Sequence, residues 1–202
     1  MQRIQVQGIH HITLVGSTRQ SAIDFWQGVH HITLLGAGRH TSIDFWEGVL
    51  GMPFVFEQPN LDNEDESHLY FDPGDGRLLT VFTNESRTDA GRLAPREVGC
   101  VEHIAFNVSR ASFQQAPVRL EQRGISYTQH DRGFMDSLYL QDPNGLKVEL
   151  SCYRFEAPSG FRDADVLIAA YRLRISRGDH HIEAGHVADA IEQLLATRDR
   201  LG

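Results

Sequence analysis

The chain has 202 residues and a formal net charge of −8, and 41% of its residues are hydrophobic. That length suits one domain with its own core, or a domain with an appendage. The acidic balance argues against nucleic acid as a partner, because phosphate binding requires clustered Lys and Arg. No apolar run is long enough to cross a membrane and the first residues lack a signal-peptide pattern, so we expect a cytoplasmic protein with no membrane partner. The two cysteines are too few for a disulfide framework, which fits a reducing compartment.

The first part of the chain contains one segment twice. "GIHHITLVGSTRQSAIDFWQ" (Gly8–Gln27) is followed at once by "GVHHITLLGAGRHTSIDFWE" (Gly28–Glu47), and both copies carry a His-His pair and an Ile-Asp-Phe-Trp run. We expect one copy to form the first strand and helix of the domain. The second copy is favoured because Gly48–Met52 leads it directly into the next strand, which leaves residues 1–27 as a surplus N-terminal segment. The first copy remains the alternative, because Ser17-Thr18 is a better helix N-cap region than its counterpart.

A second repeat, of longer range, predicts two similar modules. "VHHITLLG" resembles "VEHIAFNV", "FDPGDGRLLTVF" resembles "LQDPNGLKVEL", and each pair encloses the order strand, helix, strand, strand, strand. The expected elements between these strings are a helix at Ser42–Val49, strands at Phe54–Glu57 and Ser67–Asp72, a helix at Ala111–Arg123, and strands at Ile125–Gln129 and Ser137–Gln141.

The predicted fold class is therefore α+β, with two βαβββ modules forming an open mixed β-barrel. The modules span about 28–84 and 99–156 within a domain of residues 28–156. The alternating pattern stops at Ala157, and the spacing of apolar residues predicts two helices, Val166–Arg174 and Val187–Arg198, in a helical C-terminal tail of residues 157–202.

Strand alternation places several polar side chains on one face of the predicted sheet. His103 shares a row with Ala105, Glu149 shares one with Lys147, and His31, His68 and Tyr139 also fall on mixed rows that are backed by apolar ones. If these rows line one concave surface, two of its imidazoles and its one carboxylate can form a triad of metal ligands. That ligand set suits Fe(II) with open coordination positions.

The strings "HHITLLG", "EHIAF", "SHLYF" and "DRGFMDSLYLQDPNGLKVEL", in this order, resemble the vicinal oxygen chelate superfamily, and most of all its ring-cleaving extradiol dioxygenase branch. The resemblance covers about residues 28–155. It implies that His31, His103 and Glu149 are metal ligands and that His130 and Tyr139 assist proton transfer. It also implies an Fe(II) enzyme, with Mn(II) as the alternative, that acts with O2 on a catechol- or hydroquinone-like aromatic. We expect the protein to be a homo-oligomer, in the simplest case a dimer.

Three alternatives stay open from the sequence. A glyoxalase-type lyase or isomerase of this superfamily would use Zn(II), Ni(II) or Mn(II), and would draw a carboxylate from the last strand of both modules. Thr80 stands opposite Glu149 in the alignment of the modules, which disfavours that reading. A non-catalytic binding or resistance protein of the same fold would bind no metal. Finally, His11 of the first copy could replace His31 as the ligand.

Overall fold

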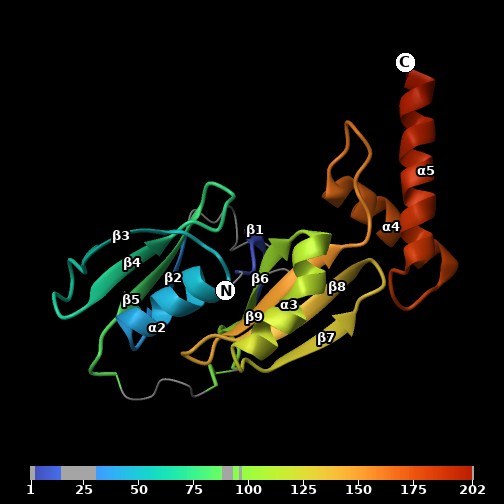
Figure 1. The fold of residues 1–202 in the computed structure, drawn as a ribbon. Coiled ribbons are helices and arrows are strands. Elements are labelled where there is room, and N and C mark those ends of the chain that lie inside the picture. The colour runs from blue at the N-terminus through green and yellow to red at the C-terminus, as the bar shows by residue number, and fades with distance from the viewer. Residues whose placement is uncertain (1–2, 15–30, 88–92, 96, 202) are drawn as a thin grey trace. The chain divides into compact units, whose positions relative to one another are not determined.

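A computed structural model describes residues 3–14, 31–87, 93–95 and 97–201 of the chain. It has an α+β fold in which one sheet has five strands and another has four, and neither sheet closes into a barrel (Figure 1). The chain divides into two compact units. The first comprises residues 1–128 and 138–151, and the second comprises residues 129–137 and 152–202.

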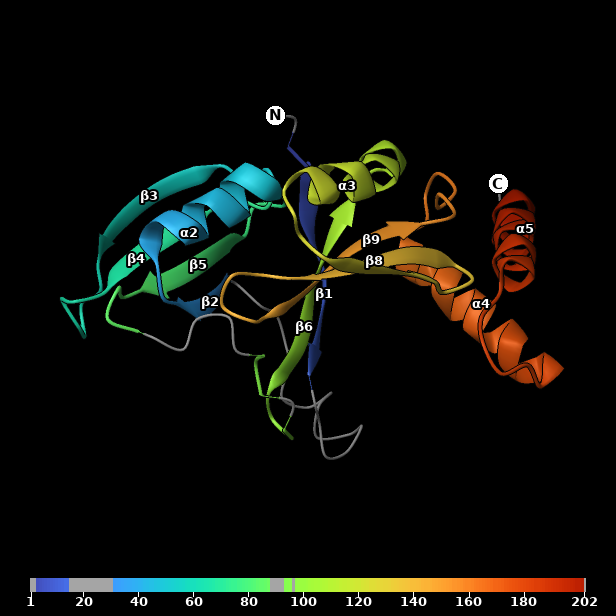
Figure 2. The ribbon, with the colours of Figure 1, turned by 60° about the horizontal axis from the view of Figure 1, so that its bottom comes forward.

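The four-stranded sheet has the order β2-β5-β4-β3 and is formed by the first module. Its strands are β2 (His31–Gly36), β3 (Phe54–Pro59), β4 (Ser67–Phe71) and β5 (Leu78–Thr83), and β2 runs parallel to β5. Between β2 and β3 the chain forms α2 (Arg39–Ile43), which continues directly into the π-helical turn η1 (Asp44–Val49). This helical segment lies over one face of the sheet (Figures 1 and 2), and Trp46 within it is completely buried.

The five-stranded sheet has the order β1-β6-β9-β8-β7. Its strands are β1 (Val6–Leu14), β6 (Val101–Val108), β7 (Tyr127–Asp131), β8 (Met135–Gln141) and β9 (Lys147–Tyr153). Helix α3 (Arg110–Gln122) covers one face of it, as Figure 2 shows. The helix begins where the Ser109 hydroxyl accepts a hydrogen bond from the Ser112 N–H at 3.1 Å, which is the usual N-cap interaction.

Both copies of the repeated strand are built into the sheets. The second copy forms β2, which completes the first module by pairing with β5, and the first copy forms β1, which pairs antiparallel with β6. Residues 6–14 of the segment expected to be surplus are therefore part of the fold. Residues 15–27, which include the Ser17-Thr18 region considered above, lie outside the described residues.

Contacts with the first module hold β1 in place beside β6. The Ile4 and Val6 N–H groups donate to the carbonyls of Val49 and Leu50 at 2.9 and 3.3 Å, at the end of η1. The Ile9 N–H donates to a carboxylate oxygen of Asp75 at 3.1 Å, in the turn between β4 and β5. Gly8 has a φ of +130°, and a side chain there would come within 2.7 Å of Asp75, so this close approach requires glycine.

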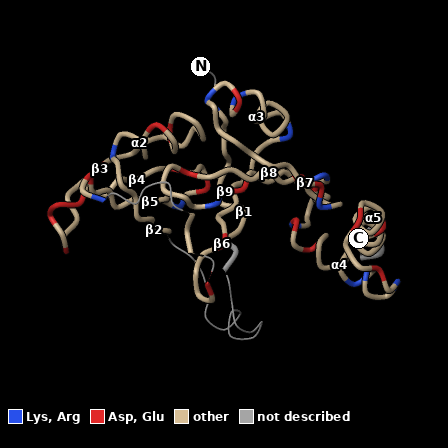
Figure 3. The backbone as a smooth tube through the Cα atoms, turned by 90° about the horizontal axis from the view of Figure 1, so that it is seen from below, with Lys and Arg blue, Asp and Glu red and all other residues tan. Residues whose placement is uncertain are grey.

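The second unit contains the two helices of the tail, α4 (Asp163–Arg177) and α5 (Ala184–Leu201). They pack against one another through a small core of Val166, Ala170, Val187 and Ala190, which Phe134 and Phe155 extend. Among the described residues, no helix combines the length and apolar character needed to cross a bilayer. In Figure 3, basic and acidic residues are scattered along the chain, and acidic residues gather in the loop that follows β3.

Candidate metal centre

Three adjacent strands bring together His11, His103 and Glu149. Ala105 of β6 pairs with His11 of β1 on one side and with Glu149 of β9 on the other. His103 stands two residues before Ala105, and its side chain therefore lies on the same face of the sheet. Because Ala105 carries only a methyl group in the middle of this set, the three polar side chains can converge above it.

The donor atoms of these side chains form a compact triangle. His103 Nε2 lies 2.9 Å from His11 Nε2 and 2.9 Å from a carboxylate oxygen of Glu149, and the same oxygen lies 3.3 Å from His11 Nε2. Among the described residues, this is the group of His, Cys, Asp and Glu that could hold a metal ion. Glu149 is fully buried and His103 is 8% exposed.

The triangle has the dimensions that a divalent transition metal requires. Three ligands at about 2.1 Å from an ion and at right angles to one another lie about 3.0 Å apart. The observed separations of 2.9 to 3.3 Å match one face of an octahedron. Two imidazoles and one carboxylate on such a face leave the opposite positions open, which is the arrangement of non-haem Fe(II) oxygenases.

Carboxylates hold both ring nitrogens of His103. Its Nδ1 hydrogen-bonds to Glu102, and its Nε2 faces Glu149. Burial by itself lowers the pKa of His103, but the hydrogen bonds and charges of Glu149 and Glu102 outweigh burial, and the net pKa is raised. The other oxygen of Glu149 accepts a hydrogen bond from the Ser151 hydroxyl at 2.8 Å, which fixes the carboxylate.

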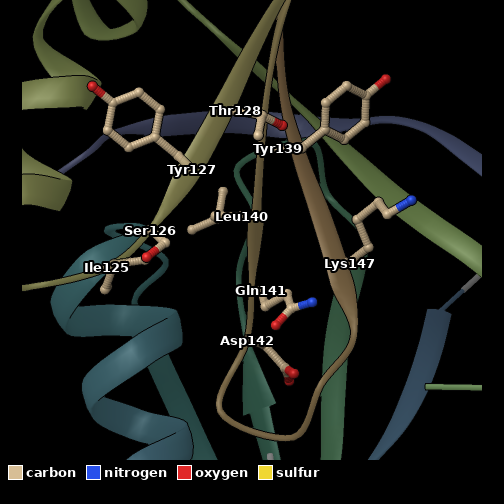
Figure 4. A pocket seen from close by; sticks show the side chains of 9 residues that line it. All are labelled: Ile125, Ser126, Tyr127, Thr128, Tyr139, Leu140, Gln141, Asp142 and Lys147. Atoms are coloured by element: carbon tan, nitrogen blue, oxygen red, sulfur yellow. The ribbon is translucent and has the colours of Figure 1, made fainter. Parts of the chain in front are cut away.

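Tyr139 borders the metal centre on the side of β8. Its ring stands edge-on to the His103 ring, with 5.5 Å between the ring centres, and the Lys147 ammonium lies 6.0 Å from the centre of the Tyr139 ring. Both residues line a cavity of about 530 Å³ together with Thr128 and Gln141. Figure 4 shows that the side chains of Tyr139 and Lys147 project to the same side of strands β8 and β9.

His31 does not lie in the group that contains His103 and Glu149; that group contains His11, and which of the two histidines binds a metal stays a prediction. His31 begins β2, where it pairs with Leu78, and its side chain is exposed. Burial lowers the pKa of His68 in the same sheet, and the nearby His31 adds a smaller electrostatic contribution. His11, the equivalent residue of the first copy, takes the place beside His103, because β1 rather than β2 pairs with β6.

The other predicted residues lie as follows. His130 is on β7 with an exposed side chain, and its role in proton transfer stays a prediction. Thr80 occupies the position in β5 that corresponds to Glu149, is buried, and donates a hydrogen bond to the Thr33 hydroxyl at 2.8 Å. Sequence reasoning missed His10 and Glu102, each of which contacts the histidine that follows it.

Comparisons with known proteins all point to one superfamily. The family model described as "Glyoxalase/Bleomycin resistance protein/Dioxygenase superfamily" matches residues 28–150. That match takes in the second copy of the repeat, but both copies carry the same His-His-Ile-Thr-Leu string, so alignment alone cannot decide which copy supplies the ligand.

Two curated proteins are similar to the chain. "Putative ring-cleaving dioxygenase MhqO" of Bacillus subtilis is 30% identical over 148 residues, which cover 72% of this chain and 40% of that protein. "Glutathione transferase FosA" of Serratia marcescens is 27% identical over 145 residues, which cover 72% of this chain and 80% of that protein. The chain therefore spans about two fifths of the length of the dioxygenase relative.

Two solved structures have the same fold. A candidate dioxygenase from Bacillus subtilis superposes with a TM-score of 0.52 and 25% identity, over 64% of this chain and 42% of that one. A glyoxalase/bleomycin resistance protein/dioxygenase domain from Frankia superposes with a TM-score of 0.54 and 16% identity, over 67% of this chain and 96% of that one. With the family match over more than half of its length, the chain belongs to the glyoxalase/bleomycin resistance protein/dioxygenase superfamily.

Proposed function

We propose that the protein is a metal-dependent, extradiol-type ring-cleaving dioxygenase that acts on a catechol- or hydroquinone-like aromatic with O2. The observation that carries this proposal is the triangle of His11, His103 and Glu149, whose donor atoms are spaced like one face of an octahedron. The similarity to MhqO, whose name describes a ring-cleaving dioxygenase, supports the same reaction class.

In this proposal, His11, His103 and Glu149 hold one Fe(II) ion, with Mn(II) as the alternative. A bound ion of this kind supplies open positions for the substrate oxygens and O2, and a route for electron density between them. The protein contributes the fixed position of the three donors. Ser151 restrains the Glu149 carboxylate, and burial of Glu149 keeps water away from that side of the centre.

In this proposal, Tyr139 and Lys147 interact with the substrate. The Tyr139 ring stands against His103 at the wall of the cavity, where its hydroxyl can donate a hydrogen bond to a substrate oxygen or accept a proton from one. The Lys147 ammonium on the same side favours a substrate that has lost a phenolic proton, because opposite charges attract in a partly buried site. The role of His130 in proton transfer rests on the sequence resemblance alone and stays a prediction.

A metal-dependent transferase or lyase is the second candidate, because the chain is also similar to a glutathione transferase along 80% of that protein's length. The residue set around the centre favours the dioxygenase. A glyoxalase-type enzyme would draw a second carboxylate ligand from the last strand of the first module. Thr80 occupies that position here, and its hydroxyl donates a hydrogen bond to Thr33.

The test is anaerobic loading of the purified protein with Fe(II) or Mn(II), followed by addition of O2 to a panel of catechols and hydroquinones. We expect O2 consumption that depends on metal and substrate, and a yellow ring-opened product. A parallel assay with glutathione and an electrophilic epoxide tests the second candidate. Metal-loaded protein that consumes no O2 with any aromatic, but conjugates glutathione, would overturn the dioxygenase assignment.

A further inference from the structure

Each histidine of the proposed metal centre follows a β-bulge. Thr13 pairs with His103 and Leu14 pairs with Val101, so Glu102 is the extra residue in β6. Likewise Ile9 pairs with Phe106 and His11 pairs with Ala105, so one extra residue, His10, stands between them in β1. A bulge breaks the alternation of a strand and can turn two consecutive side chains toward one side.

The two extra residues stand at equivalent positions of the internal repeat. "IHHITL" in β1 corresponds to "VEHIAF" in β6, so that His10 matches Glu102 and His11 matches His103. In both strands the side chain of the extra residue reaches Nδ1 of the histidine that follows. His10 Nδ1 lies 2.7 Å from His11 Nδ1, and Glu102 hydrogen-bonds to His103 Nδ1.

We propose that His10 and Glu102 are positioning residues that hold the Nδ1 protons of His11 and His103, and so direct both Nε2 atoms at a metal ion. The inference rests on the metal centre of the proposed function and not on the reaction. A histidine that binds a metal through Nε2 must keep its remaining proton on Nδ1, and an acceptor at Nδ1 fixes both the tautomer and the ring orientation. For two Nδ1 atoms 2.7 Å apart, this requires that His11 donates and His10 accepts.

Glu102 and His10 differ in the strength of the hydrogen bond that each accepts from the histidine after it. Glu102 is an anionic acceptor, 18% exposed, and its second oxygen pairs with the Lys147 ammonium, which restrains it from the neighbouring strand. His10 is a neutral acceptor. Hydrogen bonds to charged acceptors are about twice as strong as neutral ones, so Glu102 holds its histidine more firmly than His10 does. Lys147 therefore both lines the cavity and hydrogen-bonds to Glu102, the residue that accepts from His103 Nδ1.

The experiment compares Glu102→Ala and Glu102→Gln with Glu121→Gln, which makes the same change of charge on α3 away from the centre. His10→Ala is the parallel variant for β1. The first measurement is binding of Mn(II) alone, followed by the electron paramagnetic resonance signal of the free ion. Removal of a group that supports a ligand costs 10- to 100-fold in metal affinity, so we expect such a loss in Glu102→Ala. Glu102→Gln should lose less because its amide oxygen still accepts, and Glu121→Gln should bind like the parent.

The second measurement follows the Nδ1 protons by NMR of metal-free protein labelled with ¹⁵N-histidine. The parent should show a slowly exchanging Nδ1 proton on His103, and Glu102→Ala should lose it. This readout does not depend on catalysis, and it still applies if the protein cleaves no aromatic ring. Glu102→Gln preserves the side-chain volume and provides the comparison if Glu102→Ala unfolds. A parent without a protected Nδ1 proton, or a folded Glu102→Ala that binds Mn(II) within twofold of Glu121→Gln, would overturn the proposal.

Discussion

Asp75 holds the strand that carries His11, and its removal should loosen that strand selectively. One carboxylate oxygen accepts a hydrogen bond from the Ile9 N–H at 3.1 Å, and the other accepts one from the Arg77 N–H at 3.0 Å. A hydrogen bond to a charged acceptor contributes about 1.5–3 kcal/mol. Because the Asp75 side chain is 17% exposed, we take the lower end, about 1.5 kcal/mol. Losing that energy should enlarge, by roughly tenfold, the population of molecules in which β1 is detached from the sheet.

Hydrogen exchange of the β1 amides measures this population in Asp75→Ala. The control is Asp72→Ala, since the Asp72 carboxylate accepts a hydrogen bond from the Gly74 N–H at 2.7 Å within the same turn. We expect exchange of residues 6–14 to accelerate about tenfold in Asp75→Ala, with metal affinity reduced, and to stay near the parent rate in Asp72→Ala. Equal protection of β1 in both variants would refute the reasoning.

The difference between the parent and Asp75→Ala should also depend on pH. Burial by itself raises the pKa of Asp75, but hydrogen bonds from the Ile9 and Arg77 N–H groups and from the Arg77 side chain lower it, and the net pKa lies below its usual value. A carboxylate with a depressed folded-state pKa contributes stability above its unfolded pKa of about 3.9, and loses it as the pH falls through the folded pKa. Protection of β1 in the two proteins should therefore converge at low pH. A constant difference down to strongly acidic pH would contradict this.

Three further predictions concern the centre and the tail. Glu149→Gln removes the anionic ligand and should abolish most Fe(II) or Mn(II) binding while circular dichroism stays unchanged; binding equal to that of the parent would disprove the ligand assignment. Ala105→Val fills the space between His11 and Glu149, so metal affinity should fall at least tenfold, with a packing cost of about 1–3 kcal/mol; an unchanged metal titration would argue against the shared site. Val166→Ala removes two buried methyl groups from the core between α4 and α5 and should lower the free energy of unfolding by about 2 kcal/mol in urea titrations; a loss below 0.5 kcal/mol would show that this core is not packed as described.

The sequence was informative about the fold because hydrophobic alternation is a local signal. It identified both modules, and it placed His103 and Glu149 on the same face as Ala105 and Lys147, as the pairing of β6 with β9 requires. Boundaries were less accurate, because α2 begins at Arg39, three residues before the expected start. The helix needs no side-chain cap there, so the cap signal that local reasoning relies on is missing.

The choice between His11 and His31 could not be made from local sequence, since both copies carry the same His-His-Ile-Thr-Leu string. The structure separates them through contacts distant in sequence, namely the pairing of β1 with β6 and the hydrogen bond from Ile9 to Asp75. The prediction also assumed that only one copy of the repeat has a place in the two modules. In the structure β1 and β2 divide the two pairings between them.

His10 and Glu102 were missed for a different physical reason. Strict alternation assigns each of them to the face opposite the following histidine. The bulges in β1 and β6 break that rule, and a bulge depends on the partner strand as well as on its own sequence. The one available signal was positional, since both residues directly precede a candidate ligand in the internal repeat.

The most direct test of the central claim is the metal content of His11→Ala and His31→Ala after identical anaerobic loading with Fe(II). The two substitutions remove the same side chain from equivalent positions of the two copies, so each is the control for the other. Because β1 carries its histidine to His103 and Glu149, we predict that His11→Ala loses bound metal and that His31→Ala retains about one ion per chain. Loss of metal in His31→Ala with full retention in His11→Ala would contradict the account.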